Sequence, residues 1–344
     1  MTVYIGVDFH ARQQTVSCLT TEDGEMHQYQ LEHGTDDVRR FYGQFKGEVI
    51  VGLEASGYIE WFEEMMLELG HEVWVGDAAE IRRKAPRRQK NDKRDSELIL
   101  KLMVKGDFPR VHRQSPESRT VLRQVRYRHR LVKLRTIAKN SLQAMAVGSG
   151  RYFGKRVHTR TGRQQLVNLP AILAEQAEQL IKVIDGLTVE IKRVEGWLTK
   201  QAREDERVMR LQTHPGVGVL TSLVLVHTLW PVDRFANSRK VTAYLGLDPV
   251  EDSSGNRVRI GSISKQGSRL ARFLVIEAAG VAVRCDKELK GYYQSLVSRR
   301  GKPIAKVAVG RKLLTHCFIL LRDEIDYNEF LRRGVEVRSS RLSR

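Results

Sequence analysis

Thr2-Val-Tyr-Ile-Gly-Val-Asp-Phe-His10 is a short apolar strand pattern in which Asp8 directly follows the apolar run. Two further strand patterns follow at residues 15–19 and 26–31, with a turn at Asp23-Gly24 between them. Three strands joined by short turns predict an antiparallel meander. The N-terminal region is therefore expected to be built on a β-sheet that begins with the strand before Asp8.

The next segments alternate between helix and strand. The sequence predicts a helix around residues 36–45, a buried strand at 49–53, a helix at 58–69 and a strand at 71–75. Such alternation indicates parallel strands added to the meander. Mixed sheets of this kind occur in RNase H-like folds, although the pattern alone does not establish one. We expect residues 1–112 to form one α/β domain.

The remainder of the chain is predicted to be mainly helical. Residues 113–207 hold a basic helix and then an a/d heptad seam, which is either a coiled coil between protomers or one long helix of a bundle. Residues 208–330 are expected to form a mainly α C-terminal domain with closing helices near 269–283 and 302–321, and residues 331–344 a loose basic tail. The seam consists of Leu173, Ala177, Leu180, Ile184, Leu187, Ile191, Val194 and Leu198.

Composition narrows the class of protein. A length of 344 residues suggests roughly two domains at about 150 residues each, and 41% hydrophobic residues argue against wholesale disorder. The net charge of +18 indicates a polyanionic partner, nucleic acid before membrane. The sequence has no run of 18 apolar residues and no signal-peptide pattern at its start. Three scattered cysteines fit neither a disulfide framework nor a zinc cluster, so we expect a soluble protein of a reducing compartment.

Four acidic residues stand where strands and a helix begin or end. Asp8 and Glu54 each follow an apolar strand, and Asp92 and Asp95 are spaced to share one helix face. Each alone is typical of a turn, a cap or a solvated face. Together they offer the hard oxygen ligands that Mg²⁺ prefers, and two ions about 4 Å apart would stabilise attacking and leaving oxygens in phosphodiester chemistry.

A serine in the C-terminal region is a candidate nucleophile. Ser254 precedes a glycine, in a stretch that continues with Arg257, Arg259 and Lys265, whose charges are suited to holding a phosphate. No triad-like histidine and aspartate accompany it, so metal or arginine assistance would have to activate the hydroxyl. The simpler interpretation is a turn, and Ser253, Ser262 and Ser264 are equal candidates on residue type alone.

Two other patterns suggest nucleic-acid contact. A basic stripe repeats at helical spacing through Arg119, Arg123, Arg126, Arg130 and Lys133, with a solvated helix face as the alternative. His214-Pro-Gly-Val-Gly218 resembles a helix-hairpin-helix turn, in which the backbone around Gly216 and Gly218 would hold a phosphate. A plain loop before a helix explains the same residues. No residue pattern indicates how base edges would be read.

The order of these motifs along the chain resembles that in the DEDD transposases of bacterial insertion sequences, a family that includes pilin-gene-inverting invertases. The resemblance spans about residues 3–322 and rests on motifs from both halves of the chain. They are strand-Asp8, strand-Glu54-Ala-Ser-Gly57, Asp92-x-x-Asp95, the heptad seam, Pro215-Gly-Val-Gly218, Arg234-Phe235, Ala243-Tyr-Leu-Gly-Leu-x-Pro249, Ser254-Gly255 and Ser264-Lys-x-Gly267.

The resemblance implies specific roles for the candidate residues. Asp8, Glu54, Asp92 and Asp95 would be the Mg²⁺-binding tetrad of an RNase H-like, Holliday-junction-resolvase-like domain. Ser254 would be the nucleophile of an RNA-guided serine recombinase, forming a 5′-phosphoserine intermediate while it cuts and rejoins DNA.

The resemblance also implies partners and a cellular location. A structured noncoding bridge RNA from the element would pair with donor and target DNA, so that base pairing supplies the specificity. The protein would assemble as a homo-oligomer, a dimer of dimers, without contacting a membrane. It would be cytoplasmic and associated with the nucleoid when active.

Two alternatives remain open on the residues alone. A resolvase-like, metal-dependent nuclease would cut with an activated water and leave Ser254 as part of a turn. A non-catalytic nucleic-acid scaffold would use the acids only for structure. The four carboxylates favour either enzyme over the scaffold, because a scaffold needs no metal ligands. The Ser254-Gly255 context favours the transposase over the nuclease, because only the transposase needs a nucleophilic serine.

Overall fold

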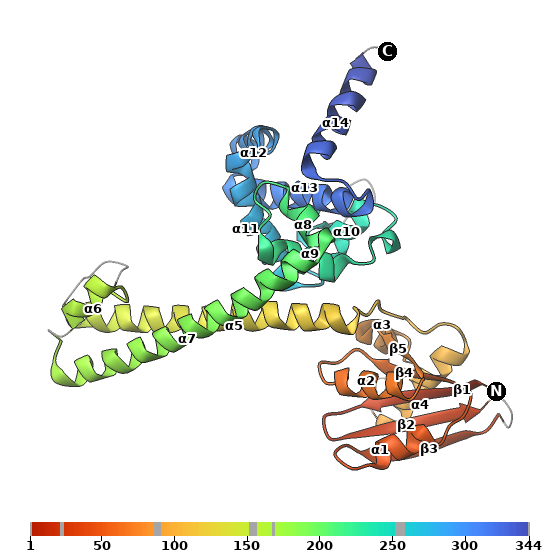
Figure 1. The fold of residues 1–344 in the computed structure, drawn as a ribbon. Helices are drawn as coiled ribbons and strands as arrows, with labels where there is room; N and C mark the ends of the chain where they lie inside the picture. Colours follow the sequence, from red (N-terminus) through yellow and green to blue (C-terminus); the bar gives the residue numbers. More distant parts are fainter. Residues whose placement is uncertain are drawn as a thin grey trace. The chain divides into compact units, whose positions relative to one another are not determined.

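The computed structural model describes residues 2–20, 24–85, 91–150, 157–166, 169–251 and 259–342. The chain divides into two compact units, Met1–Arg113 and Gln114–Arg344, which are coloured red to orange and yellow to blue in Figure 1. An α/β unit is thus followed by a largely helical one, as predicted. Within the described ranges, no helix has the length and apolar character needed to cross a membrane.

The first unit is built on a five-stranded mixed sheet of order β3-β2-β1-β4-β5. β1 pairs antiparallel with β2, and β2 with β3, while β4 joins β1 and β5 joins β4 in parallel. Both the predicted meander and its parallel additions are confirmed. The strands are β1 (Thr2–Phe9), β2 (Gln13–Thr20), β3 (Met26–Glu32), β4 (Glu48–Glu54) and β5 (Glu72–Gly76).

Alternating residues of β1 and β4 cover the two faces of this sheet. Val3, Ile5 and Val7 pack with α1 (Asp37–Gly43) and α2 (Glu60–Glu68) in one apolar cluster. Ile50 packs in a second cluster with α3 (Ala78–Arg83) and α4 (Asp92–Val104). Because side chains alternate along a strand, Asp8 and Glu54 belong to the face that α4 covers.

Small residues allow α4 to lie close to the sheet. Gly6 pairs with Ser17 on β2 and with Gly52 on β4. A Cβ on Gly6 would lie 2.4 Å from the Ser96 carbonyl oxygen and 2.5 Å from the Leu100 amide nitrogen of α4. Real Cβ atoms do not approach backbone so closely, so glycine is required for α4 to occupy this position.

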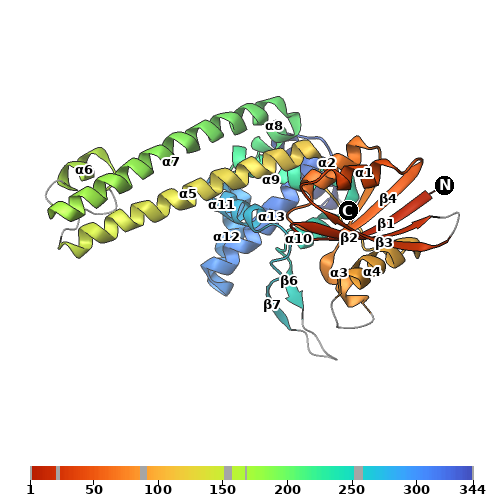
Figure 2. The same ribbon diagram turned by 90° about the horizontal axis from the view of Figure 1, so that it is seen from below.

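A long antiparallel helical hairpin opens the second unit. α5 (Pro116–Gly148) and α7 (Ala171–Glu204) lie side by side (Figures 1 and 2), and the short α6 (Arg160–Leu166) lies between them in sequence. Ile184, Ile191 and Leu198 of the predicted seam are buried in clusters shared with α5. Packing within one chain therefore accounts for the heptad pattern, and a coiled coil between protomers stays a prediction.

The rest of the second unit is helical apart from a two-stranded hairpin of β6 and β7 (Figure 2). The sequence did not predict α12, and the tail expected to be loose is helical in α14, where Glu329 pairs with Arg332 and Arg333 one turn later. The elements are α8 (Glu206–Gln212), α9 (Val219–Leu229), η2 (Val232–Arg234), α10 (Ser238–Tyr244), β6 (Pro249–Glu251), β7 (Ile260–Ile263), α11 (Arg269–Cys285), α12 (Lys287–Arg300), α13 (Lys302–Arg322) and α14 (Tyr327–Leu342).

Candidate functional site

The sheet register places two of the predicted acids on neighbouring strands. Val7 of β1 pairs with Leu53 of β4 in parallel register, and the next residues along the two strands are Asp8 and Glu54. The carboxyl ends of adjacent parallel strands lie at the same edge of a sheet. The expectation that both acids follow buried strands is met, because Val7 and Leu53 are fully buried.

The other two acids enter from the first turn of α4. Asn91 caps this helix by accepting a hydrogen bond from the Lys93 amide at 3.1 Å, and Asp92 and Asp95 lie three residues apart in its first turn. Further along, Ser96 is buried and its Oγ lies 2.8 Å from Ser17 Oγ on β2. The cap and this hydrogen bond fix the start of α4 beside the strands that lead to Asp8.

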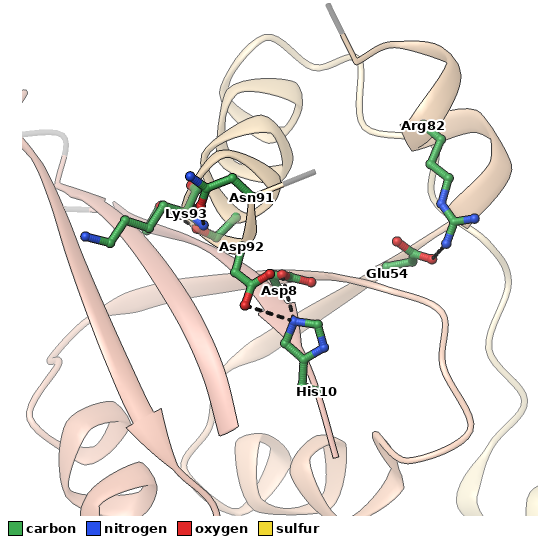
Figure 3. A network of polar contacts seen from close by, with 9 residues as sticks. Asp8, His10, Glu54, Arg82, Asn91, Asp92 and Lys93 are labelled. Atoms are coloured by element: carbon green, nitrogen blue, oxygen red, sulfur yellow. Dashed lines mark hydrogen bonds and ion pairs between the residues drawn. The ribbon is translucent and has the colours of Figure 1, made fainter. Parts of the chain in front are cut away.

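His10 joins this group, although the sequence did not single it out. Its Nε2 lies 3.1 Å from Asp8 Oδ2 and 3.5 Å from Asp92 Oδ2 (Figure 3). Ligand atoms of these three residues lie within 4.8 Å of one another. The signal in the sequence was the Asp-x-His spacing after a strand, which puts both side chains on one face.

The environment of Asp8 opposes its ionisation. Burial raises the pKa of the Asp8 carboxyl, and the charges of Asp95 and Asp92 raise it further, while His10 lowers it by its charge and hydrogen bond. Asp95, in the same first turn of α4 as Asp92, acts on Asp8 through its charge. A divalent cation among these carboxylates would offset both burial and like-charge repulsion.

Glu54 pairs with an arginine of α3 and is not part of this cluster of ligand atoms. Its Oε1 lies 3.3 Å from an Arg82 guanidinium nitrogen of α3, and Figure 3 shows the two side chains turned toward each other. The Arg82 side chain is 74% exposed, so the ion pair contributes little to stability. Of the four predicted acids, the structure thus brings Asp8 and Asp92 together at His10, places Asp95 in the same helical turn as Asp92, and holds Glu54 on the adjoining strand.

A polar hollow of about 440 Å³ adjoins Asp92. It is lined by β2 and β3 on one side and by the start of α4 on the other. Its lining includes Thr15, which pairs directly with Asp8 across the β1–β2 ladder. The lining residues are Thr15, Gln28, Tyr29, Gln30, Asn91, Asp92 and Lys93. They offer amides, hydroxyls, one carboxylate and one ammonium, which suit a polar ligand.

The donor atoms of this cluster are compatible with a divalent metal ion. Carboxylate oxygens suit Mg²⁺, Ca²⁺ and Mn²⁺, and an imidazole nitrogen suits transition metals. The exposed fractions of the Asp8, His10 and Asp92 side chains are 15%, 36% and 45%. The cluster is therefore partly desolvated and still open to solvent on the Asp92 side.

Ser254 and Arg257, like the alternative Ser253, fall outside the described residues, but the base of their hairpin is described. Gly246 and Gly267 both have positive φ, and a Cβ on Gly246 would lie 2.3 Å from the Gln266 backbone. Ser264 Oγ donates to Asp248 Oδ1 at 2.6 Å, so this serine is occupied, whereas Ser262 is exposed on β7. The segments that precede β6 and follow β7 are thus closely packed against each other.

The predicted nucleic-acid contacts lie on different parts of the second unit. On α5, Arg119 is half-buried, and the rest of the stripe is exposed. Gly216 has a φ of 93° and packs against the α11 backbone, so its conformation already explains the glycine, while Gly218 is the exposed N-cap of α9. Arg259 and Lys265 are exposed around β7. The exposed members of the stripe are Arg123, Arg126, Arg130 and Lys133.

Two transposase family models match this chain. Residues 5–148 match a model described as a transposase, of the DEDD type of IS110, and residues 208–294 match the model for transposases of the IS116/IS110/IS902 family. The first range contains all four predicted acids and the second contains Ser254.

Curated relatives carry the same kind of name. A probable family 20 transposase of Pseudomonas aeruginosa is 28% identical over 84% of this chain and 88% of its own length. The transposase for insertion sequence element IS1111A of Coxiella burnetii is 29% identical over 69% and 68%, and that for IS1328 of Yersinia enterocolitica is 26% identical over 67% and 70%. Neither a pilin invertase nor a serine recombinase is named among these matches.

Proposed function

Since the chain belongs to the IS110/IS116 family of transposases, which cut and rejoin DNA, we propose that Asp8, Glu54, Asp92 and Asp95 form its divalent metal centre. The observation that carries this proposal is the convergence of Asp8 and Asp92 on His10, from a strand and a helix more than 80 residues apart. The strand order β3-β2-β1-β4-β5 supports the RNase H-like assignment of this unit.

The residues of the cluster have separable roles. Asp8, the most buried, is the central ligand, and Asp92 and Asp95 bring the opposing carboxylates from α4. Glu54 completes the tetrad from β4 once it leaves its exposed pair with Arg82. A bound ion, which we propose to be Mg²⁺, would stabilise negative charge on the scissile phosphate. The adjoining polar hollow would hold the strand that carries that phosphate.

We further propose that Ser254 is the nucleophile. Its Oγ would attack the phosphorus, and a P–O bond would form as the bond to the 3′ oxygen breaks. The serine hydroxyl would release its proton to solvent, and the departing 3′ oxygen would take up a proton from solvent. The products are a 5′-phosphoserine and a free 3′-hydroxyl. When strands are rejoined, a 3′-hydroxyl attacks the phosphoserine and releases the serine, which reverses the step. Its support is the position of Ser254 inside the second matched range and, in the sequence, between β6 and β7.

Trapping the protein–DNA adduct tests the nucleophile. Wild-type protein incubated with labelled element-end DNA and Mg²⁺ is expected to give a denaturation-resistant adduct, and Ser254→Ala none. Ser262→Ala, an exposed serine of the same hairpin, is the matched control and should retain the adduct. An adduct undiminished in Ser254→Ala would refute the assignment.

A metal-dependent nuclease is the second candidate, because a cluster of ligands within one unit suffices for hydrolysis by activated water. It predicts cut DNA with free 5′-phosphates and no adduct in the same experiment. The scaffold alternative is set aside by membership of a transposase family.

Replacing Asp8 separates catalysis from binding. We expect Asp8→Ala to lose strand cleavage and transfer by at least about 100-fold, as removal of a group that stabilises transition-state charge does, while nucleic-acid binding stays within about twofold. Gel-shift and strand-transfer assays on one preparation measure both. Equal loss of binding and transfer would indicate that Asp8 is structural.

Guidance by an element-encoded RNA and assembly as a dimer of dimers belong to the same proposal, with action in the cytoplasm at the nucleoid. The RNA guide is supported by the excess positive charge and by the absence of an evident base-reading pattern in the sequence. Co-purification of RNA transcribed from the gene's flanks, followed by a recombination assay with and without that RNA, tests the guide. Mass photometry of the protein with and without RNA tests the assembly.

A further inference from the structure

A second hollow, of about 380 Å³, lies in the helical unit among α10, α12 and α13. It belongs to neither the tetrad nor the loop that carries Ser254. Three of its lining residues are cationic and none is acidic. The side chains that matter are Arg239, Thr242, Tyr292, Arg311, Lys312 and Thr315.

Two of the cations have no partner within the described ranges of the chain. Among the described residues, the guanidinium groups of Arg239 and Arg311 have no ion pair or hydrogen bond. Many other arginines of this unit are paired, as Arg128 is with Glu195 and Arg207 with Asp205. Because Arg311 is half-buried, it has lost part of its hydration without gaining a counter-charge, and an anionic ligand would supply one.

The remaining polar groups favour an anion over a neutral ligand. Thr242 Oγ1 already donates to the Arg239 carbonyl at 2.9 Å, and Thr315 Oγ1 to the Arg311 carbonyl at 3.1 Å. Their hydroxyl protons are therefore committed, whereas the two guanidinium groups are charged donors that no described residue engages. Guanidinium groups match the geometry of phosphate oxygens.

An aromatic ring and a third cation complete the hollow. Tyr292 is 38% exposed, and the Lys312 ammonium lies 5.2 Å from the centroid of its ring and 2.7 Å from Glu288 Oε1. An exposed aromatic face beside phosphate-binding arginines is the arrangement by which proteins hold a nucleotide of a strand, with the base or sugar on the ring.

We propose that this hollow binds a backbone phosphate of the nucleic acid on which the transposase acts, through Arg239 and Arg311, with the adjoining nucleoside against Tyr292. The proposal rests on the proposed function, since it presumes a nucleic-acid substrate. It adds a phosphodiester site that lies in the second unit and needs no metal.

Binding of fluorescein-labelled oligonucleotides to the full chain tests the site, measured by anisotropy in EDTA over a series of salt concentrations. Arg239→Ala combined with Arg311→Ala should weaken binding by about tenfold and reduce the slope of log affinity against log salt by about one. Tyr292→Leu should weaken binding to a single strand more than to a duplex. Parallel arms with duplex DNA, single-stranded DNA and RNA show which strand supplies the phosphate.

The control removes the same charge elsewhere. Lys192 and Arg203 are exposed on α7, and their double alanine variant should bind more tightly than the Arg239/Arg311 variant and keep the wild-type slope. The site would be overturned if the Arg239/Arg311 variant unfolded at the wild-type temperature and kept the wild-type slope of log affinity against log salt. It would also be overturned if both double variants lost the same amount of binding affinity. Because EDTA removes the metal, failure of the tetrad or of Ser254 leaves this measurement intact, whereas a wild-type chain that binds no nucleic acid would contradict the proposed function itself.

Discussion

His10 lies between two carboxylates from separate elements, and it brings a nitrogen ligand to an otherwise oxygen-rich cluster. Imidazole favours transition metals over Mg²⁺, because affinities for nitrogen ligands rise along the first transition series. At the residue scale, His10 would therefore adjust which ion the proposed metal centre prefers. The same pair of contacts also holds Asp8 and Asp92 in place before an ion arrives.

Replacing His10 should change metal affinity more for Mn²⁺ than for Mg²⁺. We expect His10→Asn to weaken Mn²⁺ binding by about tenfold or more and to abolish nitrogen hyperfine coupling in the electron paramagnetic resonance spectrum of bound Mn²⁺. Isothermal titration calorimetry gives the affinities. His27→Asn, an exposed histidine of β3, should behave as wild type, and an unchanged Mn²⁺ affinity in His10→Asn would exclude ligation.

At the scale of elements, the position of α4 decides whether the acids converge. The helix brings Asp92 and Asp95 to Asp8 only because Gly6 and Gly52 leave room for its backbone and for Met103. A Cβ on Gly52 would lie 2.1 Å from Met103 Sδ. The pair of glycines on adjacent strands is thus as important to the site as the ligands that it positions.

Filling this space should damage stability and metal binding together. Gly6→Ala is expected to cost about 1–3 kcal/mol in the free energy of unfolding, the usual range for overpacking, and to weaken Mn²⁺ binding because α4 must shift. Denaturant unfolding and calorimetry measure the two effects. The control, Gly186→Ala on α7, has open space around the new methyl group and should gain up to about 1 kcal/mol; a neutral Gly6→Ala would contradict the close packing.

The basic stripe of α5 is a separate element-scale prediction. Joint replacement of Arg123, Arg126 and Arg130 by alanine should weaken nucleic-acid binding and lower its salt slope by about one unit for each phosphate that the stripe neutralises. Removal of three exposed lysines of α7, Lys182, Lys192 and Lys200, provides the matched comparison. An unchanged slope in the arginine variant would place the stripe away from the nucleic acid.

Short-range patterns in the sequence predicted most helices and strands, whereas contacts between residues far apart in the chain were not predicted. Strand-end positions identified Asp8 and Glu54, and helical spacing identified Asp92 and Asp95, because these depend on short-range periodicity. His10 was missed because its partner Asp92 lies 82 residues away. The roles of Gly6 and Gly52 were missed because a glycine's need for space depends on which helix packs over it. The heptad seam was correctly predicted to be helical, but the spacing of apolar residues does not indicate which helix packs against it.

At the scale of the whole molecule, the second unit contains a buried pair of histidines, His214 and His316. His214 Nε2 lies 3.1 Å from His316 Nδ1, and Tyr327 packs against the His214 ring while it donates to Asp286. Burial, then the charges of His214 and Lys312, lower the pKa of His316 to about 4, against the weaker opposing effect of Asp286 and Glu288. Burial also lowers the pKa of His214.

Acid should therefore destabilise this unit before the carboxylates titrate. Both histidines bind protons more readily when unfolded, so stability is full above the unfolded pKa of about 6.5 and falls as pH drops toward 4, by up to about 3 kcal/mol for His316. Denaturant unfolding at pH 7.5 and pH 5 measures the loss. His316→Gln should flatten the dependence, and a loss identical to that of wild type would show that His316 does not contribute.

We propose that acids from β1, β4 and α4 form one divalent metal centre. Crystals of the full chain grown with Mn²⁺ test it directly, through the anomalous difference map. We predict a peak about 2.2 Å from the Asp8 carboxylate that also contacts Asp92 and disappears in Asp8→Asn. A map with Mn²⁺ bound elsewhere and none at Asp8 would contradict the account.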